Sequence, residues 1–296
     1  MNNINEVLKK YSIKPIKYQK KGNTLLLETK ENKYVYKENS NNIDIYSYLN
    51  SRSFNYYPKV ITDKLDSFEI TKYEEEINMP KEQKILDMIS LVSLLHFKTS
   101  YFKEIDNNEY LTLYEDLNNN IAYLYSYYSD LISLIESKIF MSPSEYLLAR
   151  NISKVLIRLD ILSEEINLWF NLVKNKEKVR QVILHNNLEL SHYIKNTNEF
   201  LISWNKSKIG MPIFDLYKFY IRNTEVDLID ILDIYERNYP LLIEEKELLF
   251  ILVKMPSIIV LDKDEYTNTT NIRKFIDYID KTEKLILPNS HDYRPN

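Results

Sequence analysis

Hydrophobic positions follow two different periods along the chain. Between residues 14 and 73, short runs rich in Leu, Val, Ile, Tyr and Phe alternate with polar turns. This pattern predicts strands at LLLET, KYVYKEN and FEITKY, with a short helix at residues 43–49. From residue 79 the apolar residues recur at three- and four-residue spacing, which is typical of helices that bury one face. By itself the pattern indicates a small mixed sheet followed by a mainly helical region.

The helical region carries clear start signals. A first helix follows Pro80 and keeps an apolar face through SLLHFKT, and a second covers roughly residues 109–137. Ser142-Pro143-Ser144-Glu145 has the form of a capping box with proline at the first helical position, so a third helix begins there and continues toward Val173. Residues 225–253 predict two further helices around Pro240, and the last dozen residues are expected to be only partly ordered.

Residues 182–220 interrupt this helical pattern. VILHNNLELSHYI and FLISWNKSKIGMPIFDLYKFY predict a strand, a tight polar loop, a second strand, a turn and an amphipathic helix that opens at Pro212.

Composition narrows the classes of function. The net charge of −4 over 296 residues argues against nucleic acid as a partner, because phosphate binding favours a basic face. The absence of cysteine excludes disulfides, thiol catalysis and cysteine-ligated zinc. With only two glycines, Gly22 and Gly210, the chain has no G-x-G-x-x-G or Walker-type phosphate loop. No apolar run reaches the length of a signal peptide or a membrane span.

The letters of residues 182–220 resemble the catalytic core of the kinase-like small-molecule phosphotransferases, the superfamily of aminoglycoside phosphotransferases and choline kinases. In that family the loop reads H-x-D-x-x-x-x-N, the second strand ends in I-D-W/F, and a helix starts near D-P-x-x-D-L. The corresponding residues are His185, Asn187, His192, Ser203, Trp204 and Asp215. SLLHFKT is similar to the family's L-H-x-x-T helix end, and the late EKELLFILVKMPSIIV is similar to the spore-coat-associated bacterial branch.

The resemblance implies a bilobal α+β protein-kinase-like fold. Residues 1–76 would form the β-rich N-terminal lobe, and residues 77–296 the helical C-terminal lobe, with the degenerate catalytic loop at 182–204. It also implies that a lysine on the third strand binds nucleotide phosphates and that an acid orients it. Lys37 is the candidate lysine and Asp44 its candidate partner. A solvated edge-strand lysine and a helix-dipole acid are the structural alternatives.

The resemblance also implies that the residues of the reaction have been replaced. Asn187 stands at the position of the catalytic aspartate, and an amide cannot act as a general base, whose loss typically costs about 10²–10⁴ in rate. His192 and Ser203 stand at the two metal-ligand positions, although Mg²⁺ prefers carboxylate and carbonyl oxygen. The family's structural positions are kept, with His185 and Asp215 holding the loop and Trp204 filling an aromatic slot.

Three hypotheses follow. In the first the chain is a pseudokinase that acts as a binding or assembly component. In the second it is an active ATP-dependent small-molecule phosphotransferase with an atypical site, in which Lys37 binds the nucleotide and Glu189 serves as a displaced base. In the second, His192 is the candidate ligand for a softer metal. In the third the motif is a coincidence in a helical binding protein with a small sheet.

Under the first hypothesis we expect no cofactor. Under the second, in which the site is active, we expect ATP and Mg²⁺. We expect protein partners, no nucleic acid, no membrane, and a small-molecule acceptor only in an active enzyme. The expected location is the cytoplasm, with association with a forming spore implied by the spore-coat resemblance.

Overall fold

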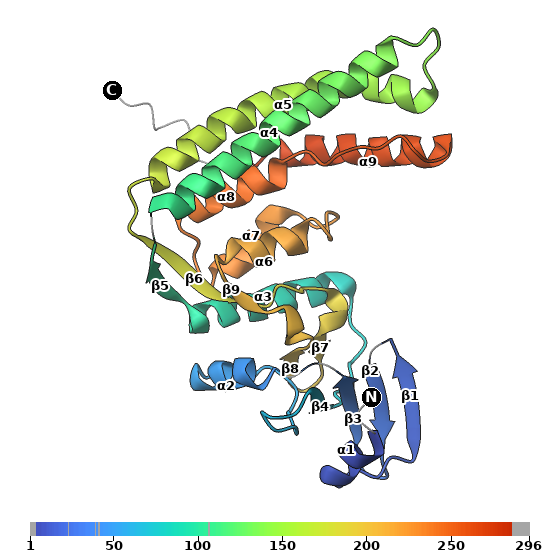
Figure 1. The fold of residues 1–296 in the computed structure, drawn as a ribbon, viewed down its shortest axis with the longest axis vertical. Helices are drawn as coiled ribbons and strands as arrows, with labels where there is room; N and C mark the ends of the chain where they lie inside the picture. Colours follow the sequence, from blue (N-terminus) through green and yellow to red (C-terminus); the bar gives the residue numbers. More distant parts are fainter. Residues whose placement is uncertain (1–3, 23, 39, 41, 106, 286–296) are drawn as a thin grey trace. The chain divides into compact units, whose positions relative to one another are not determined.

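The computed structural model describes residues 4–22, 24–38, 40, 42–105 and 107–285 (Figure 1). They divide into two compact units. Unit 1 contains residues 1–101, 181–219 and 226–240, and unit 2 contains the stretches between and after them. The predicted lobe boundary at residues 76 and 77 lies inside unit 1 and stays a prediction.

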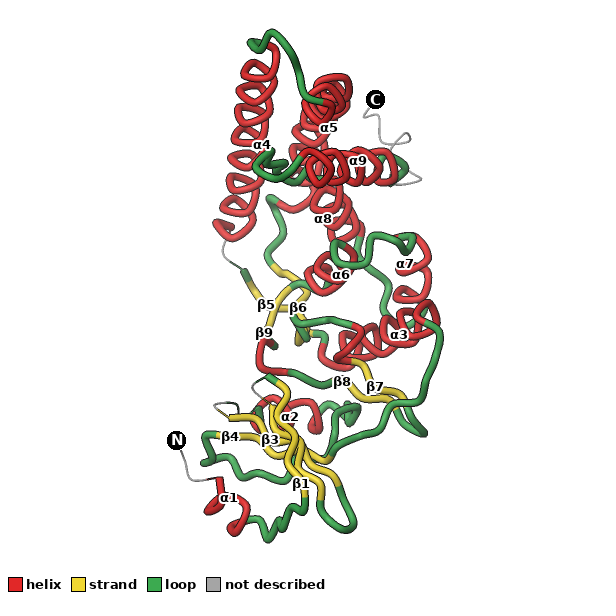
Figure 2. Tube along the Cα trace, turned by 90° about the vertical axis from the view of Figure 1, so that its right-hand side faces the viewer, coloured by secondary structure: helices red, strands yellow, loops and turns green. Residues whose placement is uncertain are grey.

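Unit 1 contains a four-stranded antiparallel sheet in the order β1-β2-β3-β4, whose strands are drawn in yellow near α1 in Figure 2. Its strands are β1 (Lys17–Lys21), β2 (Thr24–Glu28), β3 (Lys33–Glu38) and β4 (Phe68–Lys72). One face packs with α1 (Ile4–Lys10) around a core of Val7, Leu8, Ile13, Leu27, Tyr36, Phe68 and Ile70. Because side chains alternate along a strand, the residues between these face the other way and line a cleft.

Unit 1 also contains α3 (Lys81–Thr99), the helix predicted after Pro80, which buries Ile85, Met88, Ile89, Val92 and Leu95. This helix contacts α7 (Leu228–Glu236). The same unit contains α2 (Ile43–Ser51), the β7–β8 hairpin (Tyr193–Lys195 and Glu199–Leu201), β9 (Lys208–Gly210) and most of α6 (Ile213–Tyr220). The strand β6 (Lys178–Leu184) pairs with β9, and together with α6 it contributes residues to both units, as does β5 (Tyr101–Glu104).

Unit 2 is helical. The long helices α4 (Asn107–Glu136) and α5 (Pro143–Val173) contact each other, and α5 also contacts α8 (Ile243–Lys254) and α9 (Glu265–Thr282). The predicted capping box is confirmed at the start of α5, where the Ser142 hydroxyl accepts from the Glu145 N–H and the Glu145 carboxylate accepts from the Ser142 N–H.

The predicted strands and helices of residues 25–173 are confirmed within a few residues, and so is the strand, loop, strand and helix order of 182–220. The structure adds α1, β1, β5, β7, β9 and α9, which the pattern did not predict. The prediction about the last dozen residues falls almost wholly on 286–296, outside the described residues.

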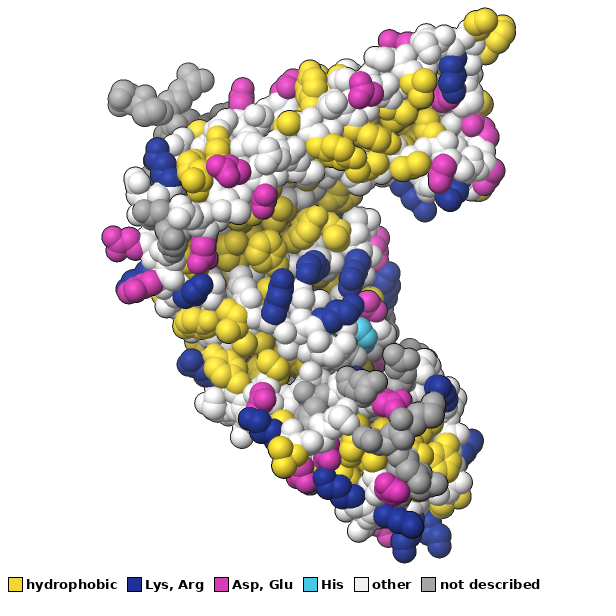
Figure 3. Space-filling model, in the orientation of Figure 1, with side chains coloured by type: hydrophobic (Ala, Val, Ile, Leu, Met, Phe, Trp, Pro, Cys, Tyr) yellow, Lys and Arg dark blue, Asp and Glu magenta, His cyan; other side chains and the backbone are white. Residues whose placement is uncertain are grey.

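Apolar side chains show on the surface of the α4–α5 pair (Figure 3). The two most exposed of them, Ile139 and Phe140, lie in the loop that joins the two helices, and Leu134 is exposed at the end of α4. Among the described residues, no helix is both long and apolar enough to cross a membrane.

Candidate functional site

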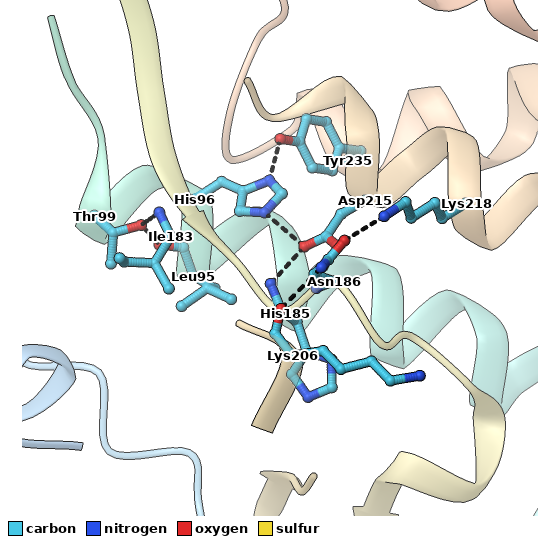
Figure 4. Close-up of polar contacts among 10 residues, drawn as sticks. All are labelled: Leu95, His96, Thr99, Ile183, His185, Asn186, Lys206, Asp215, Lys218 and Tyr235. Atoms are coloured by element: carbon cyan, nitrogen blue, oxygen red, sulfur yellow. Dashed lines mark hydrogen bonds and ion pairs between the residues drawn. The ribbon is translucent and has the colours of Figure 1, made fainter. Parts of the chain in front are cut away.

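The loop after β6 is held by one buried carboxylate. Asp215, on α6, accepts from the main-chain N–H groups of His185 and Asn186, each at 2.7 Å (Figure 4). The same carboxylate lies 3.2 Å from Nε2 of His96, whose Nδ1 lies 2.6 Å from the Tyr235 hydroxyl. Asn186 has the left-handed φ of 58°, a conformation that asparagine tolerates better than most residues. Asp215 therefore fixes the main chain immediately before residue 187.

His185 is fully buried and serves the same loop. Its Nε2 lies 2.9 Å from the Ile202 carbonyl oxygen, and its ring packs edge-on against Trp204 at 4.8 Å between centroids. Trp204, also buried, donates its indole N–H to the Leu201 carbonyl at 2.8 Å. Burial lowers the pKa of His185 to about 4, so the imidazole is neutral at pH 7. The structure thus brings together His185, Trp204 and Asp215, the three residues assigned to structural positions.

The structure also brings together the three residues at the positions of the reaction. The Asn187 side-chain amide donates to the Ser203 carbonyl at 3.5 Å, and His192 Nδ1 lies 2.8 Å from the Asn187 carbonyl oxygen. Because a carbonyl oxygen only accepts, His192 carries its proton on Nδ1 and its Nε2 is an acceptor when the ring is neutral. Ser203 has φ 69° and ψ 50°, in the left-handed region.

Lys37 lies beside Ser203, one of these three residues. Its ammonium donates to the Ser203 hydroxyl at 3.4 Å, from a half-buried position on β3. Burial lowers the pKa of Lys37, while the nearby Glu69 carboxylate opposes that shift. Lys37 is therefore a cleft residue, and the alternative of a solvated edge-strand lysine is wrong because β3 pairs on both sides.

The acid beside Lys37 is Glu69, which the sequence did not single out. Glu69 lies opposite Lys37 in the β3–β4 register and is buried. It accepts from the Asn42 amide at 2.8 Å and from the Tyr46 hydroxyl at 3.2 Å. Asp44, the predicted partner of Lys37, forms an exposed ion pair with Lys64 at 2.6 Å instead. Its place in the first turn of α2 fits the helix-dipole alternative.

Glu189, the candidate displaced base, is exposed. Its main-chain carbonyl accepts from the His192 N–H at 2.8 Å, which closes the turn between Asn187 and His192. The residues that line the cleft include Ser191, His192 and Ser203 but not Glu189.

The cleft has a volume of about 670 Å³, within the usual range of small-molecule sites. Leu26 and Val35 of the sheet line it on one side, and Ile194 and Ile202 line it from the strands beyond the loop. Lys21, Lys37 and Glu69 also line it, together with residues 73, 74 and 76 of the segment that follows β4. An apolar slot next to a charged row suits a ligand with a planar ring and charged groups.

These residues do not fit Mg²⁺. Asn187, His192 and Ser203 offer an amide, an imidazole and a hydroxyl, and the Ser203 hydroxyl accepts a hydrogen bond from the Lys37 ammonium. Mg²⁺ binds through carboxylate, carbonyl and water oxygen, and no carboxylate lies among the three residues to offset its charge. Throughout the described part of the chain, no group of three or more His, Asp or Glu side chains is arranged to hold a metal ion.

No protein-family model and no curated protein sequence matches the chain. The fold is nevertheless similar to solved structures. An aminoglycoside phosphotransferase from Alicyclobacillus acidocaldarius superposes with a TM-score of 0.69 at 9% identity, covering 94% of this chain and 92% of that one. The chain has the fold of the kinase-like phosphotransferases. A choline kinase from Streptococcus pneumoniae matches with a TM-score of 0.50 at 15% identity, covering 96% and 99% of the two chains.

The similarity confirms the predicted kinase-like fold and its α+β class, with a small antiparallel sheet and a larger helical part. The residues at 182–220 form the strand, loop and strand that the resemblance implies, which argues against the third hypothesis, in which the motif is a coincidence. The spore-coat branch stays a prediction.

Glu69 and Lys21 are the site residues that the sequence analysis missed. Glu69 lies in FEITKY, a run that alternates with apolar residues, and this alternation places it on the face opposite Phe68 and Ile70, whereas Lys21 lies in KYQKK, which shows no such alternation. That alternation was a usable signal. The pairing of β3 with β4, which puts Glu69 opposite Lys37, was not visible in the sequence.

Proposed function

We propose that this chain is a catalytically degraded kinase-like protein that acts by binding. The observation that carries the proposal is the Lys37–Ser203 contact beside Asn187 and His192. Asn187, His192 and Ser203, which stand at the three positions of the reaction, include no carboxylate. The Lys37 ammonium lies beside Ser203, where a divalent cation would need a carboxylate ligand. The general base and both metal ligands act on the same step, so their joint replacement removes its main stabilising interactions.

The proposal includes protein partners as the molecules that this chain binds. The exposed apolar residues between α4 and α5 support it, because large apolar side chains at a helix junction are common in interfaces. A cytoplasmic location and association with a forming spore remain predictions from the sequence.

The test is phosphoryl transfer from ATP, with Mg²⁺ or Mn²⁺, to water, an aminoglycoside and choline. We expect no turnover above that of heat-denatured protein. Turnover near 1 s⁻¹, the order at which kinases work, would contradict the proposal. In that case the active-enzyme alternative predicts that Glu189→Ala abolishes the activity.

A restoring variant makes the test sharper. Asn187→Asp, His192→Asn and Ser203→Asp together supply two carboxylates and an amide oxygen, and aspartate tolerates the left-handed backbone at 203. We expect this triple variant to bind Mg²⁺ with ATP where the natural chain does not. A control with the same added charge, Asn119→Asp with Ser153→Asp on exposed positions of α4 and α5, should not gain it.

A further inference from the structure

We propose that two copies of this chain form a symmetric dimer by packing their α5 helices antiparallel, with Ile157 on the two-fold axis. Such pairing goes beyond the proposed function and does not depend on it, since an active and an inactive chain can dimerise in the same way. The surface belongs to unit 2 alone, in which α5 contacts α4, α8 and α9.

Helix α5 has two apolar faces. The first is buried against the other helices of unit 2 and carries Leu148, Val155, Leu159, Leu162, Ile166, Trp169 and Val173. The second is a row of exposed side chains at helical spacing, which we call the outer stripe: Tyr146, Arg150, Ile157, Ile161, Glu164, Leu168 and Leu172. Its apolar members are between 44% and 66% exposed, whereas a surface helix usually presents a polar face to water. The outer stripe is therefore an apolar face that no other element of the chain covers.

The outer stripe is complementary to itself when two copies run antiparallel. In a register centred on Ile157, residues at equal distances from it lie opposite each other, so Arg150 of one copy meets Glu164 of the other. Tyr146 meets Leu168 further out, and Ile157 meets its own copy on the axis. A two-fold interface has this form, because each contact away from the axis is made twice. One register thus matches both the charges and the apolar side chains.

The same register aligns the two helices along their full length. Helix α5 has 31 residues, and Ile157 is one residue from its midpoint. Leu172 then lies opposite Ser142, beside the loop that exposes Ile139 and Phe140. The dimer therefore covers the apolar residues at the end of the helix pair as well as the outer stripe.

The contact area is sufficient for a reversible dimer. A helix of 31 residues is about 46 Å long and about 10 Å wide, so the α5 pair covers roughly 500 Å² on each copy. The two copies together bury about 1,000 Å², which is the lower limit of a specific interface. We therefore expect a dissociation constant on the order of micromolar rather than an obligate dimer.

Arg150 and Glu164 are both available for this contact. Both side chains are exposed, and neither makes a hydrogen bond or an ion pair with any residue that the structure describes. They are fourteen residues apart, about 21 Å along the helix, so they cannot pair within one copy. Of the charges that flank the stripe, Lys154 and Glu165 have ion-pair partners in their own copy, and Asp160 is exposed on one side.

The experiment is sedimentation equilibrium of the full chain over a range of concentrations, in which we expect a reversible change from one copy to two. Ile157→Glu should abolish the dimer, because the two-fold axis brings the two new carboxylates together. Ile229→Glu is the matched control, since Ile229 is an exposed isoleucine on α7 of unit 1, and it should leave the dimer unchanged. Both variants should keep the far-ultraviolet circular dichroism of the natural chain, because both positions are exposed.

Exchanging the two charges tests the register. Arg150→Glu alone and Glu164→Arg alone should each weaken the dimer about tenfold, because either change turns two attractive pairs into two repulsive ones. The double variant, Arg150→Glu with Glu164→Arg, should recover the natural dissociation constant. An equal mixture of the two single variants should form mixed dimers as tightly as the natural chain, since opposite charges then meet again.

A chain that stays monomeric at about 100 µM would overturn the proposal, because a micromolar dimer is almost complete at that concentration. A dimer that persists in Ile157→Glu would use another surface. A double variant as weak as the single variants would rule out the antiparallel register. The transfer assay is separate: turnover would contradict the proposed function without bearing on the dimer.

Discussion

His185 is the residue whose burial has the most direct consequence for stability. Its pKa is about 4 in the folded chain and 6.5 when unperturbed, so the unfolded chain binds the extra proton first as the pH falls. The stability that this neutral imidazole contributes is complete above pH 6.5 and is lost progressively between pH 6.5 and 4. By pH 4.5 the loss from this group is about 2–3 kcal/mol.

The measurement is the free energy of unfolding in urea at pH 7.5 and at pH 4.5, for the natural chain and for His185→Gln. We expect the natural chain to lose more stability than the variant over this interval, because glutamine does not titrate. Equal losses in the two proteins would show that His185 is not held neutral.

At the residue scale, the motif allowed the prediction of those site residues that lie close together in the sequence. His185, Asn187, His192, Ser203 and Trp204 could be predicted to share one site, because strand, loop and strand bring neighbouring residues together. Lys37 and Asp215 followed only from the family resemblance. Glu69 did not follow from either, since its position depends on how β3 and β4 pair.

At the scale of elements, the capping box of α5 permits a test that is independent of the site. Ser142→Ala removes the hydroxyl that accepts from the Glu145 N–H, and we expect a loss of about 1 kcal/mol of unfolding free energy. Ser142→Asp should keep most of the stability, because aspartate caps as well as serine. Ser153→Ala, in the exposed middle of the same helix, is the control and should stay within about 0.5 kcal/mol of the natural chain.

The elements that sequence reasoning missed lack the expected pattern. The strand β1 reads KYQKK and all five residues are exposed, so it shows no apolar alternation and its place in the sheet comes from pairing with β2. The helix α9 begins EYTNTTN, poor in helix formers, and its buried apolar residues Ile272, Phe275, Ile276 and Ile279 follow that opening segment. Its burial against α5 outweighs that weak propensity.

At the scale of the whole molecule, the path of the chain predicts cooperative unfolding. Each unit is assembled from three separate stretches, and β6 and α6 contribute residues to both units. Disordering one unit would therefore interrupt a strand and a helix on which the other depends. We expect one calorimetric transition, with the van't Hoff enthalpy close to the calorimetric enthalpy. Two resolved transitions would mean that the units fold independently.

The hydrogen bonds from the loop to Asp215 have a consequence for which substitutions the loop can accept. Its two hydrogen bonds go to main-chain N–H groups at residues 185 and 186, which nearly every amino acid supplies. The path of the loop is thus specified just before residue 187, without reference to the side chain there. We therefore expect substitutions at 187 to leave the path of the loop unchanged, whatever they do to the chemistry of the site.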